Sequence, residues 1–154
     1  MIDRFKFFAV ALQNRISIYI LSFVFKKRFS NLELVRYGTH YGGWWIPRAF
    51  LSRNFSRTLV SAGLGHDTSF DLLMAKSGAK IIGIDPLPEC VDLAKLSLED
   101  FDFIGVNAAL SASSGEARIY PPKNDLHDSW SLTNVHGTSW DDSIVVPTIS
   151  LDDV

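Results

Sequence analysis

The sequence predicts an α/β domain built around a parallel sheet. Over residues 58–106, short apolar runs of β-favouring residues alternate with segments of helical periodicity, which is typical of β-α-β units. The apolar run at residues 79–85 has little polar alternation, as expected for a strand buried on both faces of a sheet. The chain has 154 residues, of which 47% are hydrophobic, so we expect one domain with a substantial core.

Two regions differ in composition. Residues 1–36 are expected to form a helical, partly basic extension, and residues 37–154 to form the domain itself. The domain opens with residues 37–47, which are dense in tyrosine, tryptophan and glycine. Aromatic side chains in such a segment can line a ligand pocket or cover the core, and the composition alone favours the cover.

The elements of the domain follow from periodicity and from turn residues. Strands are expected at residues 58–62, 79–85 and 101–106, with helices at residues 68–77 and 89–98. Gly78 stands where a helix C-terminus favours glycine. Residues 108–112 and 116–120 flank Ser113-Ser114-Gly115, which predicts an antiparallel β-hairpin after the third strand.

The last part of the chain is less regular. Residues 123–143 are polar and predict a long loop, and loops of this length are often functional. Residues 144–149 predict a further strand, and Ser150 is expected to cap a helix that starts at Leu151.

Charge is distributed unevenly along the chain. Residues 1–57 carry ten basic and two acidic residues, a net +8, whereas residues 58–154 carry five basic and fifteen acidic ones, a net −10. The basic segment either contacts anionic lipid or nucleic acid, or neutralises the acidic body. No basic stripe with interleaved aromatic residues runs through the acidic body, so the sequence predicts no nucleic-acid site there.

The apolar stretch at residues 5–25 bears on membrane contact. Gln13-Asn14-Arg15 divides it into runs much shorter than the ~20 residues that span a bilayer. Residues 1–30 are therefore expected to dock on protein, or to lie at a membrane surface, with protein docking favoured. The sequence accordingly predicts a cytoplasmic location, with membrane association through this segment as the alternative.

Cysteine and metal-ligand patterns predict neither a disulfide nor a metal site. Cys90 is the only cysteine, and its place in a predicted helix indicates a small buried apolar residue. The spacing of His127, His136 and the neighbouring aspartates matches no metal-binding pattern.

The turn after the strand at residues 58–62 carries the main functional signal. Gly63 and Gly65 would let the backbone approach a ligand closely, beside the free N–H groups of the next helix. Asp85 ends the following strand, 20 residues after Gly65, where an acid accepts hydrogen bonds from a ribose diol. This order of elements predicts a site for a cofactor that carries a nucleoside.

A dinucleotide fits this turn less well than a cationic cofactor does. A nicotinamide site expects a third glycine where Thr68 stands. Asp67 would repel a diphosphate, whereas it suits a ligand with an ammonium and a sulfonium group. These residues favour S-adenosylmethionine over a nicotinamide dinucleotide.

Several segments of the chain can be set beside a known family. They are Tyr41-Gly42-Gly43-Trp44-Trp45-Ile46-Pro47, the glycine turn at residues 60–71, Gly83-Ile84-Asp85-Pro86, Ala108-Ala109-Leu110-Ser111 with Gly115, and Val146-Pro147-Thr148-Ile149-Ser150-Leu151-Asp152-Asp153. In order and spacing, over about residues 37–154, this set resembles the FkbM-type methyltransferases. The last segment is the most specific of them.

The resemblance implies a Rossmann-like class I methyltransferase sheet that binds S-adenosylmethionine and methylates hydroxyl groups, often on sugars or secondary metabolites. It implies that Gly63 and Gly65 lie beside the methionine part of the cofactor and that Asp85 holds the ribose hydroxyls. It also implies that Asn107 or Ala108 borders the adenine. Many such enzymes have an acid that binds the amino group where this chain has Ser61, and Asp67 is expected to take that role.

Another departure concerns the end of the chain. The family normally continues after the Leu-Asp-Asp element into a strand with a lysine and an acid-rich segment, which this chain lacks. The sequence therefore predicts a truncated sheet, with part of the acceptor pocket missing. It also predicts an exposed sheet edge through which copies of the chain self-associate.

The predicted reaction is O-methylation of a small hydroxylated acceptor. Histidine is the natural candidate for the base that removes the hydroxyl proton, and each of the four histidines is a weak candidate. They are His40, His66, His127 and His136. Two alternatives stay open: a non-catalytic module that binds the cofactor without a complete acceptor pocket, and a nicotinamide-dependent oxidoreductase.

Overall fold

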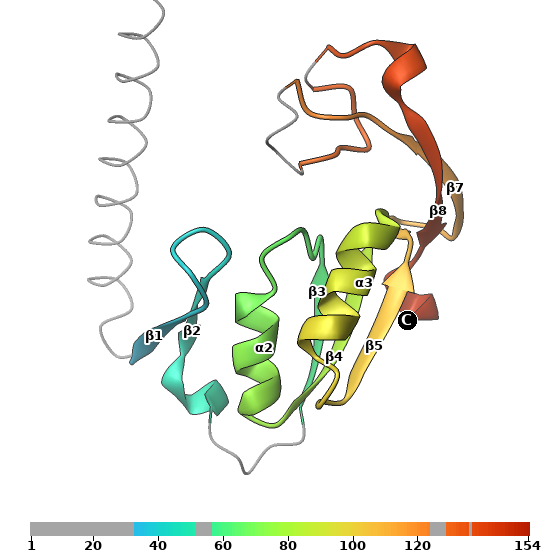
Figure 1. Ribbon diagram of the computed structural model, residues 1–154. Helices are drawn as coiled ribbons and strands as arrows, with labels where there is room; N and C mark the ends of the chain where they lie inside the picture. Colours follow the sequence, from blue (N-terminus) through green and yellow to red (C-terminus); the bar gives the residue numbers. More distant parts are fainter. Residues whose placement is uncertain (1–32, 52–56, 124–128, 136) are drawn as a thin grey trace, which may run out of the picture.

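A computed structural model describes residues 33–51, 57–123, 129–135 and 137–154 (Figure 1). Two of the four candidate bases, His127 and His136, lie outside these residues, as does most of the predicted N-terminal extension. No helix in the described ranges is long and apolar enough to cross a membrane.

The centre of the fold is a parallel sheet of three strands, which confirms the α/β prediction. Its strands are β3 (Arg57–Ala62), β4 (Ala79–Asp85) and β5 (Phe103–Asn107), in the order β3-β4-β5. The predicted strand at residues 79–85 coincides with β4, and the other two agree within two residues. Most of β4 is buried, with Ile81 and Ile84 fully so, because β4 is the middle strand.

Two helices connect these strands and pack on one face of the sheet (Figure 1). They are α2 (Ser69–Lys76) and α3 (Pro88–Ser97), close to their predicted positions. Gly78 has a φ of 91°, and its N–H donates to the carbonyl of Ala75 at 2.8 Å, so it ends α2 as predicted. Cys90 is fully buried in α3 and packs in the main core, as its sequence context indicates.

The opposite face of the sheet is apolar and partly open to solvent. Val60, Ile82 and Ile104 are partners in register across the three strands, so their side chains share that face. Val60 is 37% exposed and Ile104 is 44% exposed.

An antiparallel hairpin precedes the sheet, in the aromatic segment for which the sequence predicted no strands. It consists of β1 (Leu34–Tyr37) and β2 (Trp44–Pro47), and the short 3-10 helix η1 (Arg48–Leu51) follows it. Tyr37 and Ile46 pack against the core, so the hairpin covers the side of α2 in part. Trp44 and Trp45 are mostly exposed.

A second small sheet corrects the predicted hairpin at residues 108–120. Its strands are β6 (Ala109–Leu110), β7 (Gly115–Ile119) and β8 (Ile144–Ile149), in the order β6-β8-β7. β8 lies between the two predicted partners, parallel to β6 and antiparallel to β7. The hairpin prediction is wrong because a distant strand with a longer register displaced the pairing that the turn residues favoured.

The end of the described chain is less helical than expected. Ser150 precedes a single 3-10 turn, η3 (Leu151–Asp153), and its hydroxyl donates to the Asp153 carboxylate at 2.6 Å instead of capping a backbone N–H. Another 3-10 turn, η2 (Trp140–Asp142), lies in the predicted loop, where Arg118 stacks on the Trp140 ring at 4.3 Å.

Candidate functional site

A cavity of about 520 Å³ opens at the carboxyl ends of β3 and β4, the place where ligands bind in open parallel sheets. Its walls come from the hairpin loop, the glycine turn after β3, the first turn of α2, the segment after β4 and a distant loop. The residues that line it are Tyr41, Gly42, Gly43, Trp44, Ser61, Ala62, Gly63, Leu64, Gly65, His66, Asp67, Phe70, Asp71, Asp85, Pro86, Leu87, Ser129 and Trp130.

The glycine turn adopts a backbone that other residues rarely accept. Gly63 has a φ of 78° and Gly65 a φ of 55°, both left-handed. The N–H of Gly63 donates to the carbonyl of Ile84 at 2.8 Å, which fixes the turn to the neighbouring strand. A Cβ on Gly63 would meet no atom of the described chain within 4 Å, so the backbone here faces open space. Close backbone approach by a ligand is therefore available at Gly63.

Asp85 joins the glycine turn directly. One carboxylate oxygen accepts from the N–H of Gly65 at 3.1 Å, and the other accepts from the N–H of Leu87 at 2.9 Å. The side chain is 5% exposed, yet it contributes to the cavity wall. The two parts of the predicted site, 20 residues apart in sequence, thus lie on one side of the sheet and in one cavity.

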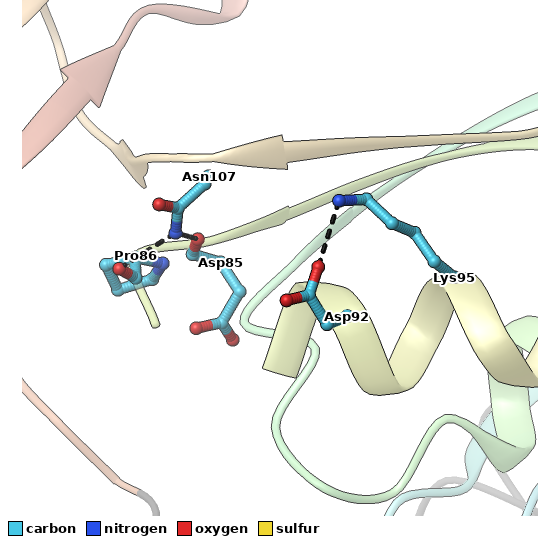
Figure 2. A network of polar contacts seen from close by, with 5 residues as sticks. All are labelled: Asp85, Pro86, Asp92, Lys95 and Asn107. Atoms are coloured by element: carbon cyan, nitrogen blue, oxygen red, sulfur yellow. Dashed lines mark hydrogen bonds and ion pairs between the residues drawn. The ribbon is translucent and has the colours of Figure 1, made fainter. Parts of the chain in front are cut away.

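Asn107 stabilises the backbone that carries Asp85. Its amide nitrogen donates to the carbonyls of Asp85 and Pro86, both at 3.0 Å, and fixes the backbone where β4 ends (Figure 2). Figure 2 also shows the Asp85 carboxylate directed away from this amide. Neither Asn107 nor Ala108 is among the residues that line the cavity, and Ala108 is buried. Their expected place beside an adenine stays a prediction.

Asp67 ties the hairpin loop to the start of α2. Its carboxylate accepts hydrogen bonds from the Thr39 hydroxyl, from the N–H of Gly42 at 3.0 Å and from the N–H of Ser69 at 3.1 Å. Hydrogen bonds from the side chains of Ser69 and Thr39 hold its pKa below the ordinary value. A Cβ on Gly42 would lie 2.7 Å from this carboxyl, so the contact requires glycine there.

Asp71 is a cavity residue that the sequence interpretation missed. Its side chain is only 3% exposed, and it lines the cavity from the first turn of α2. Burial raises its pKa, although a hydrogen bond with the Ser61 side chain acts in the opposite direction. Its Oδ1 atom has no hydrogen-bond partner among the described residues. The sequence did contain an indication of this role. Asp71 is an acidic residue on the same face of α2 as the buried Met74 and Ala75, a face that is otherwise apolar.

The aromatic segment contributes to the cavity as well as to the core. Tyr41 and Trp44 line it while remaining 74% and 67% exposed, and Trp130 reaches it from residues 129–135. Of the histidine candidates that the structure describes, exposed His66 lines the cavity and His40 does not. In the described ranges, no group of three or more histidine, cysteine or acidic side chains could hold a metal ion.

We compared the chain with protein-family models, curated proteins and solved structures. No family model, no curated protein and no solved structure matches the chain.

Proposed function

We propose that the protein is an S-adenosylmethionine-dependent methyltransferase with a Rossmann-like sheet, acting on a hydroxyl group of a small acceptor such as a saccharide or secondary metabolite. The observation that carries the proposal is the meeting of the glycine turn and Asp85 in one cavity, where the Gly65 N–H donates to the Asp85 carboxylate at 3.1 Å. This convergence is the arrangement that the sequence resemblance requires.

The residues present fit that cofactor in three respects. The open space at Gly63 can accept a ligand close to the backbone. The unpaired oxygen of Asp71 can accept a hydrogen bond from an ammonium group. The N–H groups of Gly65 and Leu87 each donate to a different Asp85 oxygen, and a carboxylate oxygen has further lone pairs that can accept from a ribose diol.

The same residues disfavour a nicotinamide dinucleotide. Three carboxylates line the cavity, from Asp67, Asp71 and Asp85, and its described lining contains no lysine or arginine. A diphosphate placed there would face negative charge without a compensating cation.

The bound cofactor would supply an activated methyl group on a sulfonium, so the chain itself has to bind, orient and desolvate the reactants. Ser61, Gly63, Gly65 and Asp85 would hold the cofactor. The exposed faces of Tyr41 and Trp44 at the cavity wall offer apolar contact to an acceptor. His66, at the turn, is the described candidate for taking the hydroxyl proton.

Titration calorimetry tests the binding step. We expect S-adenosylhomocysteine to bind the wild-type chain, NADH to show no heat of binding, and Asp85→Asn to weaken S-adenosylhomocysteine at least tenfold. The matched control is Asp92→Asn, which removes an equal charge on the exposed side of α3, away from the cavity. Binding of NADH in preference to S-adenosylhomocysteine would overturn the proposal in favour of an oxidoreductase.

A turnover assay tests the chemical step. Labelled S-adenosylmethionine with a panel of polyols and saccharides should yield methylated product. Cofactor binding without transfer to any acceptor would instead support the non-catalytic module.

A further inference from the structure

Asp71 is a buried carboxylate with one oxygen that no described residue pairs. A carboxylate in the interior needs hydrogen-bond donors or a counter-charge, because desolvation otherwise disfavours its charged form. Ser61 supplies one hydrogen bond, yet Oδ1 has no partner in the described chain although the side chain is 97% buried. An unpaired buried carboxylate oxygen in a cavity wall indicates a donor that comes from outside the described residues.

The other two acids of the cavity are in a different state. Both oxygens of Asp67 accept from the chain, and so do both oxygens of Asp85. These two carboxylates organise the loops that form the walls. Only Asp71 combines a charged group, burial and an unpaired oxygen, so the three acids are not equivalent for a ligand.

The chemistry of the donor follows from the cavity lining. No lysine or arginine is among its described residues, so none of the described lining residues brings a cation to Asp71. A charged donor gives a stronger hydrogen bond to a carboxylate than a neutral one, and it also offsets the buried charge. A ligand with an ammonium group satisfies both requirements.

We propose that Asp71, oriented by Ser61, is the receptor for the ammonium of an amino-acid moiety on the ligand, in place of the more exposed Asp67. The proposal rests on the proposed function and assigns one subsite within it. The cavity therefore selects ligands that are zwitterionic at one end, and a nucleoside without the amino-acid part should bind less tightly.

The test compares two ligands on two proteins. S-adenosylhomocysteine carries the ammonium, and 5′-methylthioadenosine keeps the nucleoside and the sulfur but lacks the amino-acid part. We expect Asp71→Asn, which preserves shape, to weaken S-adenosylhomocysteine on the order of tenfold to a hundredfold. The same variant should change the affinity for methylthioadenosine by less than about twofold, because that ligand has no ammonium to lose.

Controls separate binding from folding and from general charge effects. Asp92→Asn should leave both affinities unchanged. The ligand-free Asp71→Asn protein should melt at the same temperature as wild type or higher at pH 7, because the substitution removes a buried charge. A melting temperature well below wild type would show that Asp71 has a structural role and overturn the proposal.

The remaining outcomes are also decisive. Equal losses for both ligands in Asp71→Asn, or no loss for either, would overturn the proposal while leaving the proposed function in place. A loss specific to S-adenosylhomocysteine in Asp67→Asn but not in Asp71→Asn would assign the ammonium to Asp67. Absence of binding of either ligand to wild type would refute the proposed function itself, and the Asp71 subsite with it.

Discussion

Asp67 and Asp71 stand four residues apart at the start of α2, and their environments drive their acidities in opposite directions. Hydrogen bonds from hydroxyl and N–H donors stabilise the charged form of Asp67, so its pKa is lowered. Burial destabilises the charged form of Asp71, so its pKa is raised. The Asp67 carboxylate therefore stabilises the folded chain, whereas the Asp71 carboxylate lowers the stability of the ligand-free protein at neutral pH.

Asp67→Asn should lower the free energy of unfolding at pH 7 by about 1–2 kcal/mol, because it weakens the hydrogen bonds to Thr39, Gly42 and Ser69. The folded-state pKa of Asp67 lies below its unfolded value, so this stabilisation is present above the unfolded pKa and is lost as the pH falls through the folded pKa. Denaturant titrations between pH 7 and pH 2.5 would measure it. A difference between variant and wild type that stays constant down to the lowest pH would contradict this account.

The residues of the site could be predicted only where they lie in a turn of known chemistry. Gly63, Gly65 and Asp85 follow from the order of strand, turn and acid, and the structure brings them together. Asp71 could not be assigned in the same way, because a helical position acquires its role from the strand residue that it meets, here Ser61. The engagement of Asp67 with the hairpin loop depends on tertiary contact between residues 39–42 and 67, which no local pattern encodes.

At the scale of elements, the loop of the β1–β2 hairpin leaves no room for a side chain at Gly43. A Cβ on Gly43 would lie 2.4 Å from the carbonyl oxygen of Thr39 and 2.7 Å from that of Tyr37. The Gly43 N–H also donates to the Thr39 carbonyl at 3.0 Å. Since the neighbouring Gly42 and Trp44 line the cavity, this tight loop sets the position of one cavity wall.

Gly43→Ala should destabilise the protein by about 1–3 kcal/mol, because backbone atoms must move to admit the methyl group. Hydrogen exchange should show lost protection at the N–H of Gly42. Gly78→Ala is the control: its Cβ would meet open space, so only its left-handed backbone adds cost, about 1–2 kcal/mol. Retained protection of the Gly42 amide in Gly43→Ala would refute the tight-loop interpretation.

Element prediction succeeded for the β-α-β units, and it failed for the β1–β2 hairpin and for the pairing of the second sheet. The strands and helices of residues 57–107 follow from periodicity, because each β-α-β unit packs against its neighbour in sequence. The chain does bend at Ser113 and Ser114, as the turn residues predicted. However, β6 has only two residues, too few to compete with β8 as the partner of β7. Which distant strands pair depends on how many residues each pair can bring into register. A single sequence does not reveal that pairing.

At the scale of the whole molecule, the three-stranded sheet has one face covered by helices and one apolar face that is partly exposed. In the described chain no strand pairs with the outer edge of β3, so the edge and the adjacent face around Val60 and Ile104 are both available. Parallel sheets usually have both faces covered. The exposed region therefore favours association with apolar surface.

We expect the wild-type chain to self-associate with rising concentration, and the double variant Val60→Thr/Ile104→Thr to do so less. Threonine retains the β-branched shape that suits a strand and reduces the apolar surface. Sedimentation velocity over a hundredfold concentration range measures the effect, with Ile144→Thr on β8 as the control. A wild-type chain that stays monomeric throughout would contradict the expectation.

The insertion of β8 between β6 and β7 has a consequence for biosynthesis. The parallel sheet is complete in outline once residue 107 has left the ribosome, since each of its strands pairs with the next one in sequence. The second sheet must wait for residues 144–149, and the Ser113 carbonyl waits for the Thr148 hydroxyl, 35 positions later. A nascent chain halted after residue 107 and before residue 144 would have a paired parallel sheet, while β6 and β7 would lack their partner strand. Folding should therefore proceed in two separable stages.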